Sequence, residues 1–306
     1  MEKNKYLSLA IKVLKEELQP LTSNEIWEKA VTKSYDKELG TTGRTPWASL
    51  GAQLYGSQKS SKYFEKVGSR PTKFILKENI SKIDKEKIQT AITSQEEEKK
   101  VSYKEKDLHQ LMAYYASVYM NVYSKTIEHT KSKKSKMAEW AHPDMVGCFF
   151  PFELWQKETS ELSSELGSLP VKLYSFELKI QLTFSNIREY FFQAVSNSSW
   201  SNEGYLVASE IQQDPEFLME LKRLSSSYGI GIIKLDVEDP DNCEILFPAR
   251  EKNELDWETI NKIIDLNPDF QEFIELITSN IKLKNRKIIK DGFDKIKDID
   301  DLIITK

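Results

Sequence analysis

Two carboxylates and a lysine are the residues of this sequence whose types and spacing are best suited to chemistry. Asp144 follows Pro143 at the start of one apolar stretch, and Glu177 and Lys179 interrupt another apolar stretch at residues 171–182. Side chains alternate between the two faces of a β-strand, so Glu177 and Lys179 are expected to share a face. Burying charged groups is costly unless they are paired or bind a metal ion. The pattern therefore predicts a functional site that joins these three charged residues.

The alternative is a structural ion pair, because an acidic residue two positions before a lysine recurs in this chain. Other such triplets lie in polar or helical stretches: Glu97-Glu98-Lys99, Glu98-Lys99-Lys100 and Glu220-Leu221-Lys222. Glu177 differs because it interrupts an apolar stretch and lies 33 residues after Asp144. We therefore favour a functional site, since perturbed charged groups gather at such sites as well as in structural networks.

The two carboxylates favour Mg²⁺, with Mn²⁺ as the second choice. Mg²⁺ prefers hard oxygen ligands, retains waters and can present one as a nucleophile while it neutralises charge on a phosphate. Lys179 would add positive charge for the developing phosphorane. On the helix expected next along the chain, Glu189, Gln193 and Asn197 are one turn apart and form a polar stripe. Gln193 is expected to contact the DNA backbone or Lys179, and an exposed polar face is the alternative.

Other kinds of site are not supported. The sequence contains no G-x-S-x-G nucleophile elbow, no Walker loop and no dinucleotide fingerprint. Its three histidines, His109, His129 and His142, have no metal-binding spacing and are expected to be surface or structural residues. The two cysteines, Cys148 and Cys243, support neither a disulfide framework nor a zinc site. A reducing compartment fits best, so the cytoplasm is expected.

The elements that position these residues predict an α/β core, a central sheet flanked by helices. Strands are expected at residues 145–150, 171–182, 204–209 and 230–237. Helices are expected at residues 107–127, 185–196 and 215–228. Asp214-Pro215 opens the last of these helices and Gly229 closes it. The tail, residues 251–306, is expected to be mainly helical.

The N-terminal part predicts a winged helix. The expected elements are, in order, a helix at 7–18, a helix behind a Thr22–Glu25 capping box, a helix from Pro46, and strands at 63–67 and 73–76. In helix-turn-helix proteins the last helix lies in the major groove. The residues expected to contact DNA lie on or beside that helix and on the hairpin: Arg44, Thr45, Ser49, Gln53, Arg70 and Lys73.

Charge is distributed unevenly along the chain. Residues 1–77 carry a net charge of +6 and the remainder carries −10, within a total of −4. A basic head makes this part the candidate for phosphate contact, and ordinary charge scatter is the alternative. The contents of 39% hydrophobic and 30% charged residues exclude a disordered chain and a membrane protein. Lysines interrupt the apolar residues of the first helix, so a secretory signal is not expected.

Three segments of the head resemble the HARE-HTH domain, a winged helix found attached to restriction endonucleases and chromatin proteins. They are SNEIWEKAV, LGTTGRTPWASLGAQLY and FEKVGSRPTKFIL. The resemblance covers nearly all of residues 1–77. It implies that the domain binds DNA, and it raises the sensing of modified bases as a further role.

Asp144, Glu177 and Lys179 resemble, in order and context, the PD-(D/E)XK nuclease signature. The segments HPDMVG, YSFELK and FFQAVSNSSWSNEGYLV are similar to restriction-endonuclease-like proteins that carry an N-terminal HARE-HTH domain. The resemblance implies that Asp144, Glu177 and the Leu178 carbonyl hold Mg²⁺. It implies that Lys179 orients or activates the attacking water. A helix ahead of the core often adds a carboxylate in that family, and Glu105 is our choice.

The sequence therefore predicts a HARE-HTH domain at 1–77, a charged linker at 78–102, and a PD-(D/E)XK nuclease-like domain at 103–306 with a helical C-terminal tail. The expected function is a Mg²⁺-dependent endodeoxyribonuclease of a restriction or defence system. It would act on double-stranded DNA as a homodimer, with a cognate methyltransferase as a further partner and no membrane. The alternative is a DNA-binding regulator with an inert nuclease fold, which would not need Lys179 beside Glu177. An RNA-processing nuclease is disfavoured because the reader resembles a duplex-groove binder.

Overall fold

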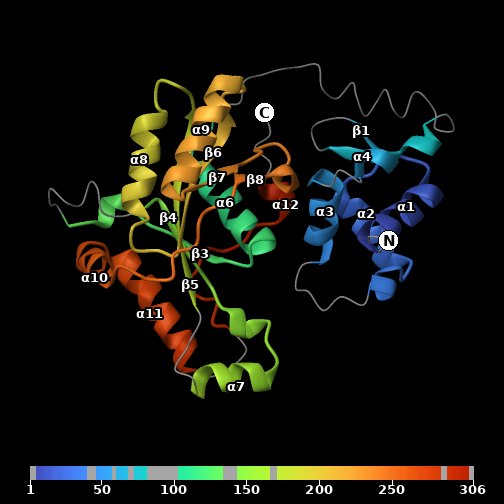
Figure 1. Cartoon of the computed structure of the whole chain (residues 1–306). Helices are drawn as coiled ribbons and strands as arrows, with labels where there is room; N and C mark the ends of the chain where they lie inside the picture. The colour runs from blue at the N-terminus through green and yellow to red at the C-terminus, as the bar shows by residue number, and fades with distance from the viewer. Residues whose placement is uncertain are drawn as a thin grey trace. The chain divides into compact units, whose positions relative to one another are not determined.

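A computed structural model of the chain describes residues 5–39, 46–56, 60–67, 72–80, 103–133, 143–165, 171–283 and 288–302 (Figure 1). The chain divides into two compact units. The first contains Met1–Ser102, Asp236–Asn242 and Ile299–Lys306, and the second contains Tyr103–Leu235 and Cys243–Asp298. Several positions predicted from the sequence lie outside the described residues: Arg44, Thr45, Arg70, His142 and residues 81–102 of the linker.

The first unit has three helices followed by a β-hairpin. Its elements are α1 (Lys5–Glu17), α2 (Ser23–Thr32), η1 (Asp36–Leu39), α3 (Pro46–Gly56), α4 (Ser60–Tyr63), β1 (Phe64–Val67), β2 (Lys73–Leu76), η2 (Lys77–Asn79) and α12 (Ile299–Leu302). Thr22 and Glu25 form the predicted capping box at the start of α2. The strands are antiparallel, with Phe64 opposite Leu76. One core joins buried residues of all three helices and β2: Leu14, Ile26, Leu50, Leu54 and Phe74. The winged-helix prediction is confirmed.

A six-stranded mixed sheet forms the centre of the second unit. Its strands lie in sequence order: β3 (Tyr123–Thr126), β4 (Met145–Phe149), β5 (Lys172–Leu182), β6 (Glu203–Ile211), β7 (Gly231–Lys234) and β8 (Glu244–Phe247). β5, β6 and β7 are parallel to one another, and the other neighbouring pairs are antiparallel. Parallel neighbours need a crossover connection, which α8 provides between β5 and β6 and α9 between β6 and β7.

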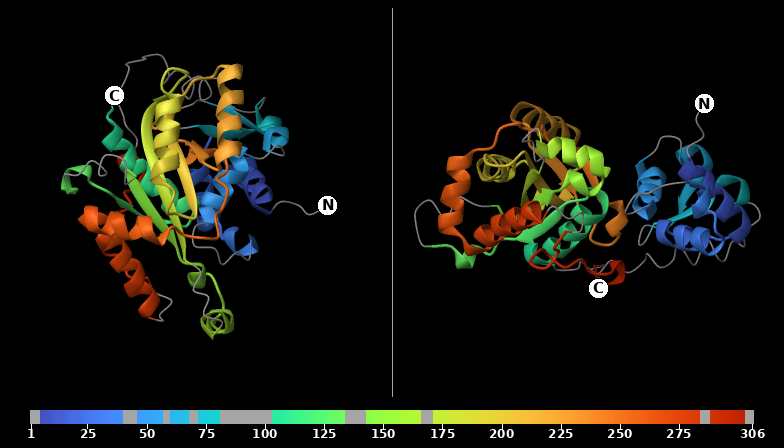
Figure 2. Two further views of the ribbon diagram at one scale, coloured as in Figure 1. Left: turned by 60° about the vertical axis from the view of Figure 1, so that its left-hand side comes forward. Right: turned by 90° about the horizontal axis from the view of Figure 1, so that it is seen from below.

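Helices pack against this sheet. They are α6 (Glu105–Tyr119), α7 (Lys157–Glu165), α8 (Ile187–Asn197), α9 (Pro215–Tyr228), α10 (Trp257–Leu266) and α11 (Pro268–Lys282). Figures 1 and 2 show α8 and α9 side by side over the sheet, where Phe191 and Phe217 share a buried core with Leu206 of β6. A second core contains residues of β3, β4 and α11: Tyr123, Val146, Cys148, Phe270 and Phe273.

The predicted fold class, a winged helix-turn-helix followed by a mixed β-sheet flanked by helices, is confirmed. The ends of α9 also agree, since Asp214 caps its start and Gly229 closes it with a φ of +77°. The predicted helix at 107–127 is wrong beyond Tyr119, because Asn121 has a φ of +57° and the chain then enters β3. α7 and β8 are not predicted, and β7 is shorter than the expected strand at 230–237.

Neither cysteine takes part in a disulfide. Cys148 and Cys243 are buried free thiols. Burial raises the pKa of the Cys148 thiol, which suits a packing residue and not a nucleophile. Among the helices that the structure describes, none combines the length and the apolar character needed to cross a bilayer.

Candidate active site

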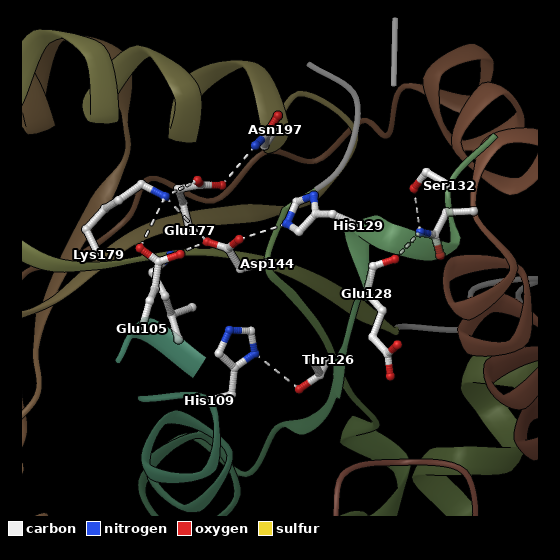
Figure 3. Close-up of polar contacts among 12 residues, drawn as sticks. Glu105, His109, Thr126, Glu128, His129, Ser132, Asp144, Glu177, Lys179 and Asn197 are labelled. Carbon is white, nitrogen blue, oxygen red and sulfur yellow. Dashed lines mark hydrogen bonds and ion pairs between the residues drawn. The ribbon is translucent and has the colours of Figure 1, made fainter. Parts of the chain in front are cut away.

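Asp144 is fixed at the start of β4. The antiparallel register that pairs Met145 with Phe176 brings Asp144 beside the middle of β5. Its carbonyl accepts a hydrogen bond from Ile127 N at 2.9 Å, and its Oδ2 accepts one from Leu178 N at 2.7 Å. Backbone and side chain are both held, so the carboxylate lies against β5 (Figure 3).

Lys179 lies within a cluster of carboxylates (Figure 3). Its Nζ is 2.7 Å from Glu177 Oε1 and 3.7 Å from Asp144 Oδ2. Glu105, at the start of α6, brings its Oε2 to 4.0 Å from the same nitrogen. Glu177, Asp144 and Lys179 are 1%, 5% and 8% exposed, whereas the Glu105 side chain is 44% exposed. The structure thus brings together four of the predicted site residues, three of them buried.

Two residues outside the predicted site contact its carboxylates. Asn197 Nδ2 donates to Glu177 Oε2 at 2.8 Å, and His129 Nε2 lies 2.9 Å from Asp144 Oδ1. Sequence reasoning missed both, because His129 was expected to be surface or structural and Gln193 was chosen from the polar stripe. That stripe was a signal for Asn197, whereas no spacing relates His129 to Asp144. Gln193 is half-buried on α8 and hydrogen-bonds to none of the described residues.

The two buried carboxyl groups differ in pKa. Burial raises the pKa of Glu177 to about 7, the Asp144 charge adds to this, and the Lys179 charge opposes it only in part. Burial also raises the pKa of Asp144, but the His129 hydrogen bond, the Lys179 charge and a backbone N–H together bring it below its usual value. Asp144 is therefore the ionised carboxylate at neutral pH, and Glu177 is the group that titrates there.

The cationic groups respond to the same charges. Burial lowers the pKa of Lys179, but the charges of Asp144 and Glu177 outweigh this effect and the net shift is upward. The hydrogen bond with Asp144 raises the pKa of His129. Burial raises the pKa of Glu105. Lys179 therefore supplies a permanent positive charge to the cluster at neutral pH.

Asp144 and Glu177 provide oxygen donors that suit Mg²⁺ or Mn²⁺. No group of three or more His, Cys, Asp or Glu side chains placed to hold a metal ion occurs among the described residues. Mg²⁺ does not need such a group, because one or two carboxylates commonly hold it while water and substrate oxygens complete its shell. The Leu178 peptide is tied to Asp144 through its N–H group, which keeps its carbonyl near the pair. The donor set fits the ion on these grounds.

Comparison with protein families identifies the first unit. Residues 6–74 match the model of the HARE-HTH family, whose description names the ASXL and restriction endonuclease HTH domain. The chain has an N-terminal HARE-HTH domain. The predicted domain family is thus confirmed, and its occurrence in restriction endonucleases implies DNA binding. Comparisons of the chain with curated proteins and with solved structures gave no match.

The HARE-HTH domain presents one predicted contact residue openly to solvent within the part of the chain that the structure describes. Ser49 is exposed on α3, the third helix of the domain. Gln53, one turn further along α3, is half-buried, and so is Lys73 at the start of β2. Ser49 is therefore the position at which DNA contact by α3 can be tested with least disturbance of the core.

Proposed function

We propose that the chain is a Mg²⁺-dependent endodeoxyribonuclease, in which the HARE-HTH domain selects duplex DNA and the second unit hydrolyses its phosphodiester bonds. The observation that carries this proposal is the buried cluster of Asp144, Glu177 and Lys179. Buried charges are costly to a fold. Carboxylates for a metal ion and a cation for the phosphate are what metal-assisted phosphodiester hydrolysis needs. The restriction endonucleases named in the HARE-HTH description support the same conclusion.

The residues of the second unit would divide the work between them. Asp144, Glu177 and the Leu178 carbonyl would hold Mg²⁺, or Mn²⁺ in its place, which when bound supplies a Lewis acid and an activated water. Lys179 orients that water and places positive charge where the phosphate gains negative charge. Glu105 is the candidate for a further acidic contact, because its carboxylate reaches the same cluster from α6.

Reader and cutter in one chain suit a restriction or defence system. Cutting both strands of a duplex most simply takes two active sites related by a two-fold axis, which a homodimer would provide. A cognate methyltransferase, and recognition of modified bases by the HARE-HTH domain, belong to the same proposal. The alternative is a DNA-binding regulator whose second unit is inert.

Metal-dependent cleavage by the full chain is the direct test. With Mg²⁺, we expect cleavage of either methylated or unmethylated genomic DNA, because a restriction system distinguishes the two. EDTA should abolish cleavage and added Mn²⁺ should restore it, since carboxylates need a divalent ion to act on a phosphate. Native and denaturing gels separate double-strand breaks from nicks. Binding without cleavage for both DNAs and both ions would contradict the nuclease and favour the regulator.

A negative charge on α3 is expected to weaken DNA binding. Ser49 is exposed, so Ser49→Glu should leave the core intact while it places a carboxylate on the helix that meets the duplex. Like charges brought together at an interface cost several kcal/mol, so we expect the Kd to rise roughly tenfold or more. Cleavage of saturating DNA should stay nearly unchanged. Ser8→Glu, at an exposed position of α1, is the matched control in the same gel-shift assay. Equal Kd values for the two variants would remove α3 as the reader.

A further inference from the structure

Asn197 is a neutral residue that holds one side of the Glu177 carboxylate. Its Nδ2 donates to Glu177 Oε2 at 2.8 Å, while Lys179 Nζ donates to Oε1 at 2.7 Å (Figure 3). Asn197 is 2% exposed and Glu177 is 1% exposed, so water hardly competes for this bond. Both oxygens of Glu177 are therefore held, one by a neutral donor and one by a cationic donor.

The fold sets the direction of the Asn197 side chain. Asn197 is the last residue of α8. Its carbonyl accepts hydrogen bonds from Ser175 Oγ at 3.0 Å and from Trp200 Nε1 at 2.8 Å. Ser175 lies on β5 two residues before Glu177, and Trp200 is fully buried. The amide is thus presented to Glu177 by a backbone that is anchored to the same strand.

The other amide atom of Asn197 gains nothing from its position. Oδ1 is buried and has no hydrogen-bond partner within the residues that the structure describes. Figure 3 shows Nδ2 turned toward Glu177 and Oδ1 turned away from it. An unpaired buried carbonyl oxygen is destabilising, so an apolar side chain of similar size would serve packing better. The N–H group that touches Glu177 is therefore the part of this side chain with a favourable role.

We propose that Asn197 is a positioning residue of the site, which holds the Glu177 carboxylate in the orientation that binds the metal ion. This inference rests on the proposed function. Hydrogen-bonded partners of metal-binding groups orient them and tune the affinity for the metal. An amide does so without adding positive charge, whereas a second lysine at this place would repel the ion. Lys179 then remains the cation that serves the phosphate.

The test measures Mn²⁺ binding by the full chain with isothermal titration calorimetry, beside single-turnover cleavage. Loss of such a partner weakens metal binding or activity roughly tenfold to hundredfold. Asn197→Ala and Asn197→Leu should both raise the Kd for Mn²⁺ by this factor and slow cleavage. Asn197→Leu fills the space and removes the unpaired oxygen, so its melting temperature should not fall below that of the wild type.

Asn280→Ala is the matched control. Asn280 is also 2% exposed and lies on a helix, α11, where its Nδ2 donates to the carbonyls of Leu276 and Ile289. This variant should lose stability and keep the wild-type Kd for Mn²⁺. Wild-type Mn²⁺ affinity in Asn197→Leu would overturn the positioning role and leave the nuclease proposal intact. A wild-type chain that neither binds Mn²⁺ nor cleaves DNA would overturn both.

Discussion

Replacing Lys179 with alanine is expected to slow single-turnover cleavage by roughly two or more orders of magnitude, and to leave DNA affinity unchanged. Its Nζ lies 2.7 Å from Glu177 and 3.7 Å from Asp144, so its charge is placed for the reaction and not for the selection of DNA. A preorganised charge in a site with little water stabilises a transition state far more than it would in bulk water. Rapid quench at saturating DNA gives the rate, and gel shift gives the affinity.

The control for this variant comes from another acid-x-Lys triplet of the chain. Lys222 follows Glu220 with the same spacing, but it is exposed on α9. Lys222→Ala should therefore cleave as the wild type does. Loss of Lys179 leaves two buried carboxylates without their cation, so thermal unfolding in Mg²⁺ establishes that the variant is folded. Wild-type cleavage by Lys179→Ala would remove this residue from the mechanism.

The predicted motif could be placed because strand geometry is local. Side-chain alternation on β5 requires Glu177 and Lys179 to share a face, and their charged atoms are 2.7 Å apart. His129 and Asn197 could not be found in this way. His129 comes from a 3-10 turn after β3, and Asn197 comes from the end of α8. Their approach to the carboxylates depends on how these elements pack on the sheet, which no local pattern records.

The error at residues 107–127 has the same physical origin. Leu, Met and Ala favour a helix, but the differences in propensity are mostly below about 1 kcal/mol per residue. Pairing with β4 outweighs such differences and recruits Tyr123–Thr126 as an edge strand. Asn121 makes the transition with a positive φ, a conformation that asparagine adopts more readily than most residues. Tertiary pairing therefore decides where this helix ends.

Glu177→Gln is expected to raise stability while it removes cleavage. Burial and the Asp144 charge raise the pKa of Glu177 from 4.5 to about 7, so the folded chain holds this proton more tightly than the unfolded chain. The metal-free wild type should lose stability as the pH rises from about 4.5 to about 7 and then stay level. Glutamine does not titrate. Above about pH 7 the variant should therefore be more stable than the wild type, by up to roughly 3 kcal/mol.

Cleavage by the same variant should fall on the order of a thousandfold, because an amide replaces one of two carboxylates proposed to hold an ion worth several kcal/mol to the transition state. The glutamine oxygen can still accept from Asn197, so the change removes charge and preserves shape. Thermal unfolding in EDTA at about pH 5 and about pH 8 measures stability, and single-turnover assays with Mg²⁺ measure cleavage. A structural ion pair predicts the reverse, because Lys179 would lose the partner at 2.7 Å that stabilises it. A lower melting temperature at about pH 8 with unchanged cleavage would assign the cluster to folding alone.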